Sequence, residues 1–464
     1  MPNPFRHYEG VPVLDLPADP PEPQIAALDV LQGKKGATSA PDGAAFLSQL
    51  MFYSASISAS KRVPSTGYTY ALRVNPSSGN LHPTEFHFCT QGVVDWPDGL
   101  YHYRPSSHMA EQRGLGQFIV EAGEAPSPFV FVLTSIVWRE AWKYRDRAYR
   151  YCLHDIGHAW QSLSLAARAI GCKSFALGQF ADDGVAETLF LGEDEWPMLI
   201  VGIRGASAPL SRSAPPERNL FGGEPNRLSE EQISYPLIER IHVATKLSRK
   251  PSAENLAQPK ASGVGEIRLP GPFFESRSFG EVVRGRRSAL DFRGGDQSIS
   301  LSQLAAILSC TKEPLFADFA AVRFIQLYLY VHCVEGLARA VYRYWPGAGE
   351  LEKIRGGDQR MAAAALSLGQ NLAGNACVAL SMIADLESAA ELYGDRGYRY
   401  VHFEAGAIGQ RMYLAAEALG LRATGIGAFF DDEVHRYLSL APDRGQVVYH
   451  FAIGYPLPDP RLEI

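Results

Sequence analysis

A polar loop at residues 73–85 holds the densest set of groups that could bind a ligand. Pro76 and Pro83 fix φ at two points and remove two backbone donors, and Gly79 lets a ligand approach the main chain. Short donors and acceptors lie between the prolines: Ser77, Ser78 and Asn80. A loop this stiff and polar is suited to bind a flat or anionic ligand. The alternative is a tight surface turn before the next strand.

A second candidate is the pair Lys143-Tyr144, which precedes a predicted helix. A lysine acts as a base near neutral pH only if burial or a neighbouring cation lowers its pKa from about 10.4. Arg145 and Arg147 could contribute such a charge. The alternative is a surface lysine at a helix start, beside a packing tyrosine.

Histidine and aspartate pairs receive a structural interpretation. His154 and His158 are one helical turn apart and could be metal ligands, but no third ligand is evident, so we expect a helix surface or a contact with the edge of a bound ligand instead. Asp182-Asp183 and Asp431-Asp432 each follow a Gly-x-Phe turn, and we interpret them as helix N-caps.

Composition bounds the class of protein. The chain has 464 residues, 46% of them hydrophobic and 20% charged, and a formal charge of -6, which argues against a general nucleic-acid binder. No apolar run is long enough to span a bilayer, and the N-terminus has no apolar signal core. The six cysteines have no paired spacing, so we expect reduced thiols and a cytoplasmic protein.

The elements that must position these groups occur twice. The stretch from Tyr144 to Tyr151 returns as Tyr393 to Tyr400, and the helix after each copy shows apolar residues on one face. Before the repeat ends, a Gly-x-Phe-x-Asp-Asp stretch also returns in register. In the first copy we predict helices at 44–57 and 149–170, and strands at 85–90, 100–104, 129–133, 173–177 and 198–203. The sequence therefore predicts a tandem duplication of one α+β domain that forms an intrachain pseudo-dimer.

Four segments follow from this division. Residues 1–40 are predicted to form an N-terminal arm and residues 41–205 the first domain. Residues 206–272, rich in Pro, Ser, Arg and Gly, are predicted to be a linker with one helix at 229–246, and residues 273–464 form the second domain.

The two copies differ in a complementary way. The second copy begins with the basic run 284–287 followed by Ser288, where the first has only Lys34-Lys35. The Pro-Ser-Ser-Gly-Asn loop exists only in the first copy, and the second has residues 311–315 in its place. Arginine forks match phosphate oxygens, although a solvated basic patch is the alternative.

Taken together, these motifs resemble the SagB-type dehydrogenases of the FMN-dependent nitroreductase superfamily, among them the azoline dehydrogenases of peptide modification. The resemblance implies two nitroreductase-like domains, each with an antiparallel sheet flanked by helices, and FMN at their interface. It implies one complete FMN site per chain, because the other would lack both the arginines and the loop. The cofactor-binding residues implied are, from the second copy, Arg286, Arg287, Ser288, Gly425, Gly427 and Ala428 and, from the first, Arg73, Pro76, Ser77, Ser78, Gly79 and Asn80.

The resemblance also gives Lys143 and Tyr144 a catalytic role, as the dyad that removes the ring Cα proton; in the second copy Leu392 replaces the lysine. The expected function is oxidation of an azoline ring or a related Cα–heteroatom bond in a peptide or peptide-like substrate, with a peptide-modifying synthetase complex as a possible partner. The alternatives are an NAD(P)H-dependent nitro- or quinone-reductase and a non-catalytic scaffold of a peptide-modifying complex.

Overall fold

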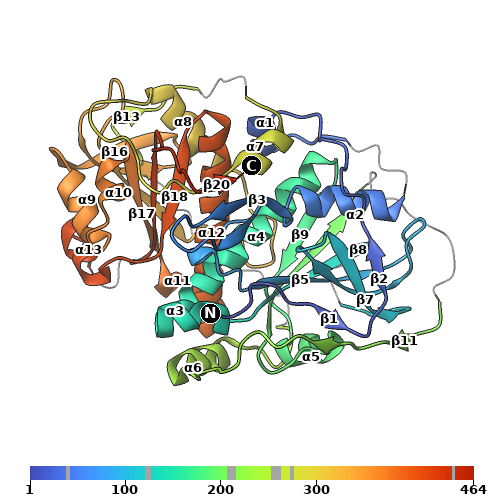
Figure 1. Cartoon of the computed structure of the whole chain (residues 1–464). Coiled ribbons are helices and arrows are strands. Elements are labelled where there is room, and N and C mark those ends of the chain that lie inside the picture. Colours follow the sequence, from blue (N-terminus) through green and yellow to red (C-terminus); the bar gives the residue numbers. More distant parts are fainter. Residues whose placement is uncertain are drawn as a thin grey trace.

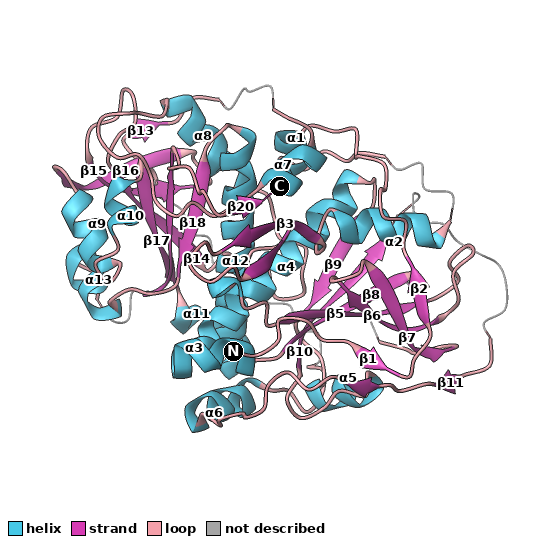
Figure 2. Cartoon of the chain, in the orientation of Figure 1, coloured by secondary structure: helices cyan, strands magenta, loops and turns pink. Residues whose placement is uncertain are grey.

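Two α+β halves lie side by side in the computed structural model of the chain (Figure 1). The structure describes residues 1–37, 42–120, 127–205, 216–251, 263–271, 276–441 and 445–463. Each half has its own antiparallel sheet, and helices line the contact between the halves (Figure 2). The predicted fold class and the tandem arrangement are confirmed.

The first sheet has the strand order β11-β7-β6-β5-β8-β10-β9, with β2 also paired to β7. Its strands are β2 (Val13–Asp15), β5 (Thr84–Thr90), β6 (Gly99–Arg104), β7 (Met109–Leu115), β8 (Phe129–Ser135), β9 (Lys173–Leu177), β10 (Trp196–Arg204) and β11 (Asn219–Leu220). The helices of this half are α1 (Ala27–Leu31), α2 (Gly43–Phe52), α3 (Trp138–Tyr144), α4 (Ala148–Ala169) and α5 (Asp182–Thr188). Helix α6 (Pro236–Thr245) belongs to the connecting segment.

The second sheet has the order β13-β16-β15-β14-β17-β19-β18. Its strands are β13 (Ile267–Arg268), β14 (Ile325–Val331), β15 (Ala340–Trp345), β16 (Glu350–Gly356), β17 (Val378–Ala384), β18 (Arg422–Ile426) and β19 (Gln446–Gly454). Its helices are α7 (Phe279–Gly285), α8 (Leu301–Cys310), α9 (Arg360–Leu366), α10 (Asn371–Asn375), α11 (Leu386–Tyr393), α12 (Gly397–Ala418) and α13 (Asp431–Leu438).

Two small sheets tie distant segments together. The strand order β20-β3-β4 joins the chain's end (β20, Leu462–Glu463) to β3 (Ile57–Arg62) and β4 (Thr69–Arg73) of the first half. Strand β1 (Tyr8–Glu9) of the predicted arm pairs with β12 (Glu224–Pro225) of the predicted linker. Both predicted appendages therefore pair with other parts of the chain where the structure describes them.

Helices α4 and α12 run together through the centre of the molecule (Figure 1). Two glycines allow their backbones to come close together. A Cβ built on Gly157 would lie 2.3 Å from the carbonyl oxygen of Phe403, and one on Gly406 would lie 2.2 Å from that of His154. Real Cβ atoms essentially never come so close, so the two helices depend on glycine at both positions.

The predicted N-caps are wrong. Residues Ala181 and Phe430 precede α5 and α13, and neither helix has a side-chain cap. The carboxylate of Asp182 instead binds Arg396 and Arg399 of the second copy, at 2.5 and 2.8 Å. A sequence window shows only local backbone partners for an aspartate, whereas these arginines come from the other domain.

The reciprocal ion pairs occur on the other side of the pseudo-dimer. Asp431 binds Arg147 and Arg150 of the first copy, at 3.0 and 2.6 Å. In register, these arginines are the equivalents of Arg396 and Arg399. The start of α12 therefore binds the start of α5, and the start of α4 binds the start of α13.

Two predicted helices are longer than the observed ones. Helix α2 ends at Phe52, since the N–H groups of Ala55 and Ser56 both return to the carbonyl of Met51. Helix α6 begins at Pro236, because proline favours the first helical position and keeps the preceding Tyr235 extended. None of the helices that the structure describes has the length and apolarity needed to cross a membrane.

The close helix contact leads to a first prediction. Gly406→Ala should destabilise the protein by roughly 1–3 kcal/mol or more, the usual cost of overpacking, because backbone must move to admit the methyl group. Thermal unfolding measures this. The matched control is Gly184→Ala in α5, where the nearest atom to a built Cβ is 3.8 Å away. That variant should be neutral or slightly more stable, and an equal loss in both would contradict the helix contact.

Candidate functional site

The polar loop is held against the central helix α4. Its 3-10 turn covers Ser78–Asn80, with positive φ at Gly79 (57°) and Asn80 (61°). The carboxylate of Asp155 in α4 accepts from both the backbone N–H and the hydroxyl of Ser78, at 3.1 Å. Within the loop, the Ser77 hydroxyl accepts from the N–H of His82 at 2.8 Å. The loop conformation therefore depends on one buried carboxyl of the neighbouring helix.

The lysine–tyrosine pair lies directly against this loop. A Cβ built on Gly79 would be 2.4 Å from the Tyr144 hydroxyl oxygen and 3.2 Å from Lys143 Nζ. Tyr144 also meets the ring of Tyr151 edge-on, with centroids 4.8 Å apart. Burial, and then the charge of Glu140, raise the pKa of Tyr144. Lys143 is exposed, so burial does not desolvate its amine in this structure.

The predicted phosphate-binding arginines are buried between the two copies. Arg286 donates from Nε to the carbonyl of Val74, near the start of the loop, at 3.0 Å. Arg287 donates from Nη2 to the carbonyl of Ser58 at 3.0 Å. Within the described residues, Arg286 Nη1 and Arg287 Nε have no partner. Each guanidinium thus keeps one buried nitrogen that can donate to an anion.

Ser288 and the glycine-rich turn converge on a tyrosine of α12. Tyr413 Oη lies 2.9 Å from Ser288 Oγ and accepts from the N–H of Gly425 at 2.8 Å. The guanidinium of Arg286 lies 5.1 Å from the centre of the same ring. These three predicted residues are therefore brought together around Tyr413.

Of the remaining turn residues, Gly427 contacts the first copy, whereas Ala428 contacts its own domain. A Cβ on Gly427 would lie 2.4 Å from the ring of Tyr151, and the Gly427 carbonyl accepts from Arg147. The carbonyl of Ala428 accepts from Gln370 at 3.3 Å. Through Tyr151, this turn of the second copy adjoins the dyad and loop of the first.

Arg73 is used differently from the other predicted residues. Its guanidinium donates to the carbonyl of Pro4 at 2.7 Å and lies 5.2 Å from the ring of Phe5. Arg73 also meets the arginine pair through its backbone, because its carbonyl accepts from Arg286. The structure thus places the side chain of Arg73 against the N-terminal segment.

Sequence reasoning missed two tyrosines, and the surface position that it allowed for two histidines is wrong. Tyr449 of β19 stacks on His154 at 4.2 Å and lies 3.1 Å from His158 Nε2, and its hydroxyl would be 2.0 Å from a Cβ on Gly425. Both histidines are buried in the interface, and the described residues contain no group of three side chains that could hold a metal. For Tyr413, a comparison of the two copies would have given a signal, because the first copy has Ser164 at the equivalent position.

The equivalent place in the other half is filled by the protein itself. Ala176 is the counterpart of Gly425. Its N–H donates to the carbonyl of Phe316, and its carbonyl accepts from the N–H of Asp318. The Asp318 carboxylate accepts from the N–H groups of Gly178 and Gln179, at 2.8 and 3.1 Å.

An aromatic ring completes this filling. Phe319 stacks on Tyr400, the counterpart of Tyr151, at 4.3 Å and 10°. In the intact half, by contrast, the N–H groups of Gly427 and Ala428 donate to none of the residues that the structure describes. Only one of the two pseudo-symmetric places thus keeps free backbone donors.

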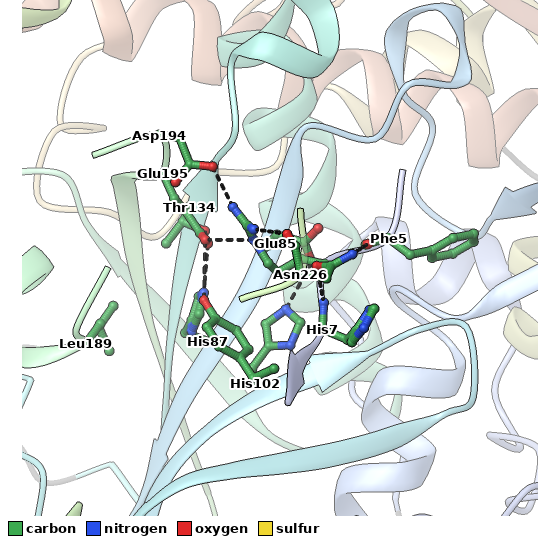
Figure 3. A network of polar contacts seen from close by, with 12 residues as sticks. Phe5, His7, Glu85, His87, His102, Thr134, Leu189, Asp194, Glu195 and Asn226 are labelled. Atoms are coloured by element: carbon green, nitrogen blue, oxygen red, sulfur yellow. Dashed lines mark hydrogen bonds and ion pairs between the residues drawn. The ribbon is translucent and has the colours of Figure 1, made fainter. Parts of the chain in front are cut away.

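A buried polar network that includes Glu85 and His102 of the first sheet (Figure 3) also binds Arg139 of the dyad helix. Arg139 of α3 binds the Glu85 carboxylate at 2.5 Å and the carbonyls of His82 and Asn3 at 2.7 and 3.0 Å. His102 lies between Glu85 and Glu111, at 3.1 and 2.9 Å. Burial by itself would raise the pKa of Glu85, but the charge of Arg139 lowers this pKa to about 2.

Comparisons with known proteins agree with this architecture. The Nitroreductase family model matches residues 65–205 and 283–455, more than half of the chain, so the chain belongs to the nitroreductase family. A solved structure from Anabaena variabilis, described as a nitroreductase, shares the fold with a TM-score of 0.73 at 24% identity. It covers 98% of this chain and 94% of that one, so the two-domain arrangement is shared.

Two relatives match single segments. A protein of Methanocaldococcus jannaschii that carries the name nitroreductase MJ1384 is 31% identical over 182 residues, 38% of this chain and 90% of that protein. The microcin B17-processing protein McbC of Escherichia coli is 31% identical over 147 residues, 29% of this chain and 54% of McbC. The chain thus spans about half of McbC. The resemblance to this superfamily is confirmed, McbC supports the SagB-type relationship, and the chain is a flavin oxidoreductase.

The contact between Gly79 and the dyad can be tested. Gly79→Ala should cost about 1–2 kcal/mol for a side chain at positive φ and should also displace Tyr144, whose hydroxyl occupies the space of the new methyl group. Gly67→Ala is the matched control, since Gly67 also has positive φ (70°) but nothing within 4 Å of a built Cβ. Thermal unfolding should show a larger loss for Gly79→Ala, and equal losses would contradict the contact.

Proposed function

We propose that this protein is an FMN-dependent dehydrogenase that oxidises an azoline ring, or a related Cα–heteroatom bond, in a peptide or peptide-like substrate. The observation that carries the proposal is the contact of Lys143 and Tyr144 with Gly79, in the one copy whose sequence keeps the Pro-Ser-Ser-Gly-Asn loop. In the other copy the equivalent place is filled by Asp318 and Phe319.

The residues present fit FMN. Its phosphate would be held by the free N–H groups of Arg286 and Arg287 and by the Ser288 hydroxyl, since charge-assisted bonds suit phosphate oxygens. The turn at Gly425 and Gly427 leaves no room for side chains and keeps backbone donors, which suits a flat ring. When bound, FMN supplies the hydride acceptor.

The chain's own residues then have distinct tasks. Lys143 Nζ takes the Cα proton of the substrate, and the Tyr144 hydroxyl orients this proton or shares it. The Ser77 to Asn80 loop, fixed by Asp155, holds both groups at the site. Exposure of Lys143 gives the substrate access from solvent and lets the proton leave.

The match to McbC, named for processing microcin B17, supports a peptide substrate and a place in a peptide-modifying synthetase complex. A second candidate, an NAD(P)H-dependent nitro- or quinone-reductase, is favoured by the match to 90% of the protein named nitroreductase MJ1384. Flavin reduction by NADPH, with none by an azoline peptide, would select that candidate. A colourless purified protein would select the scaffold.

Cofactor stoichiometry tests the asymmetry of the two copies. We expect one FMN per chain, measured as released flavin absorbance against protein, and two flavins per chain would overturn the asymmetry. Replacing both Arg286 and Arg287 by Ala should weaken FMN binding by several kcal/mol, at roughly 1.5–3 kcal/mol for each charge-assisted bond. The matched control replaces Lys34 and Lys35, which stand at the corresponding place in the first copy, and should retain flavin.

Anaerobic single-turnover reduction of the flavin by an azoline peptide tests the dyad. Lys143→Ala should stay yellow and folded but lose about 10²–10⁴-fold in rate, the usual contribution of a general base. Tyr144→Phe should lose less, because its hydroxyl only orients or shares the proton. Tyr393→Phe, at the equivalent position beside Leu392, is the control and should react like the wild type. A wild-type rate in Lys143→Ala would assign the base elsewhere.

A further inference from the structure

The second copy contains a cavity of about 200 Å³, lined by the segment that precedes β14 and by the central helix α12. This segment, residues 311–323, stands before β14 as the polar loop stands before β5 in the first copy. Sites for drug-sized ligands measure roughly 300–1,000 Å³, so this cavity suits a smaller molecule. None of the predicted FMN-binding residues, all of which the structure describes, lines it.

Arg411 of α12 is the buried cation of this cavity. Its residue is 2% exposed, and its two terminal nitrogens donate to the carbonyls of Glu313 and Pro314. Its Nε has no partner among the described residues. A buried donor without an acceptor is unfavourable, so a ligand that accepts from Nε would remove a cost that the protein alone leaves in place.

Two further arginines increase the positive charge around Arg411. Arg323 also lines the cavity, and it donates to the carbonyls of Thr311 and Ile325 at 3.0 and 3.2 Å. Arg168 approaches from α4 of the first copy. Burial, and then the charges of Arg168 and Arg323, lower the pKa of Arg411 to about 9. A bound anion would offset this repulsion.

The cavity also has two carboxylates, and both have other neighbours. Glu404 accepts from the N–H groups of Phe324 and Ile325 at 3.0 and 3.2 Å. The Glu313 side chain lies against Gly33, just after α1. The lining thus has one more cationic than acidic side chain, because three cations line it: Lys312, Arg323 and Arg411. This charge matches one monoanion.

The rest of the wall selects the kind of anion. Apolar side chains of Leu315, Phe319, Val322 and Ile408 line the cavity beside Arg411. Such a wall favours an apolar body over a fully hydrated ion, because contact removes apolar surface from water. The first copy has no such arginine, since its residue at the position of Arg411 is Ser162.

We propose that this cavity is a binding site for a small carboxylate with an apolar body, of the size of one aromatic ring. The carboxylate accepts from Arg411 Nε, Arg323 and Lys312 balance its charge, and its apolar body packs against Leu315 and Val322. Exposed Lys312 and neighbouring exposed residues give the ligand access from solvent. The site takes its ligand whatever substrate the flavin site oxidises.

Calorimetric titration of the purified full chain with benzoate tests the site. We expect benzoate to bind, and benzamide, which has the same shape without the charge, to bind at least about tenfold more weakly, because it loses a charge-assisted hydrogen bond. Inorganic phosphate, an anion without an apolar body, should also bind at least about tenfold more weakly. No benzoate binding, or equal binding of benzamide or phosphate, would overturn the proposal.

A variant that fills the cavity locates the binding. Ala320 lines the cavity and is half-buried, so Ala320→Leu should weaken benzoate binding at least about tenfold and keep the flavin. The matched control is Ala362→Leu in α9, another half-buried alanine, which lies outside the cavity and should bind benzoate like the wild type. Ala320→Leu is the deciding variant, because Arg411→Met would also remove two hydrogen bonds to the segment and disturb its fold.

The outcomes separate this site from the flavin site. Benzoate bound beside the flavin would change the flavin absorption spectrum and would bind Ala320→Leu as tightly as the wild type. That result would overturn the cavity as a carboxylate site and leave the proposed function standing. A wild type whose flavin no azoline peptide reduces would overturn the proposed function and leave the cavity unaffected.

Discussion

The contact of α4 with α12 at Gly157 and Gly406 is the constraint on which the rest of the structure depends. Each glycine lies against a backbone carbonyl of the other helix, so the two copies share one central helix pair. The reciprocal ion pairs of Asp182 and Asp431 then fix the helix starts across the same interface. Because the helices lie so close, a turn of the second copy and a loop of the first can line one site.

Fusion of the copies allowed them to diverge. In a symmetric dimer both sites change together, whereas a tandem chain can lose one site and keep the other. At the turn of the first copy, Asp318 accepts backbone N–H groups and Phe319 stacks its ring on Tyr400, so the protein itself fills this place. The filled place therefore gives an internal comparison for the place that keeps free backbone donors.

Two buried glutamates near the dyad differ in whether their carboxylates have partners. Glu85 is paired with Arg139 and His102, and this pairing ties α3 to the first sheet. Glu140, the next residue along α3 after Arg139, is buried without a hydrogen-bond partner among the described residues. A buried charge that is paired can hold a structure in place, whereas a buried charge without a partner lowers stability. Helix α3 therefore carries both Arg139, which anchors it to the sheet, and Glu140, whose burial is unfavourable.

The sequence alone determined the duplication, the main strands, the superfamily resemblance and the complementary loss of motifs. These features depend on local order and on comparison of one half with the other, both of which a sequence contains. The loop and the dyad could both be recognised in the sequence, but the contact of Gly79 with Lys143 depends on the folded structure.

The tertiary structure alone decided which partners the charged residues find. Asp182 and Asp431 were predicted to cap their own helices and instead bind arginines of the other domain. Tyr413 and Tyr449 line the site because α12 and β19 pass beside the glycine turn, which no local pattern indicates. No sequence pattern singled out Glu140. Its meaning depends on burial, and burial is a property of the packed chain rather than of the sequence around it.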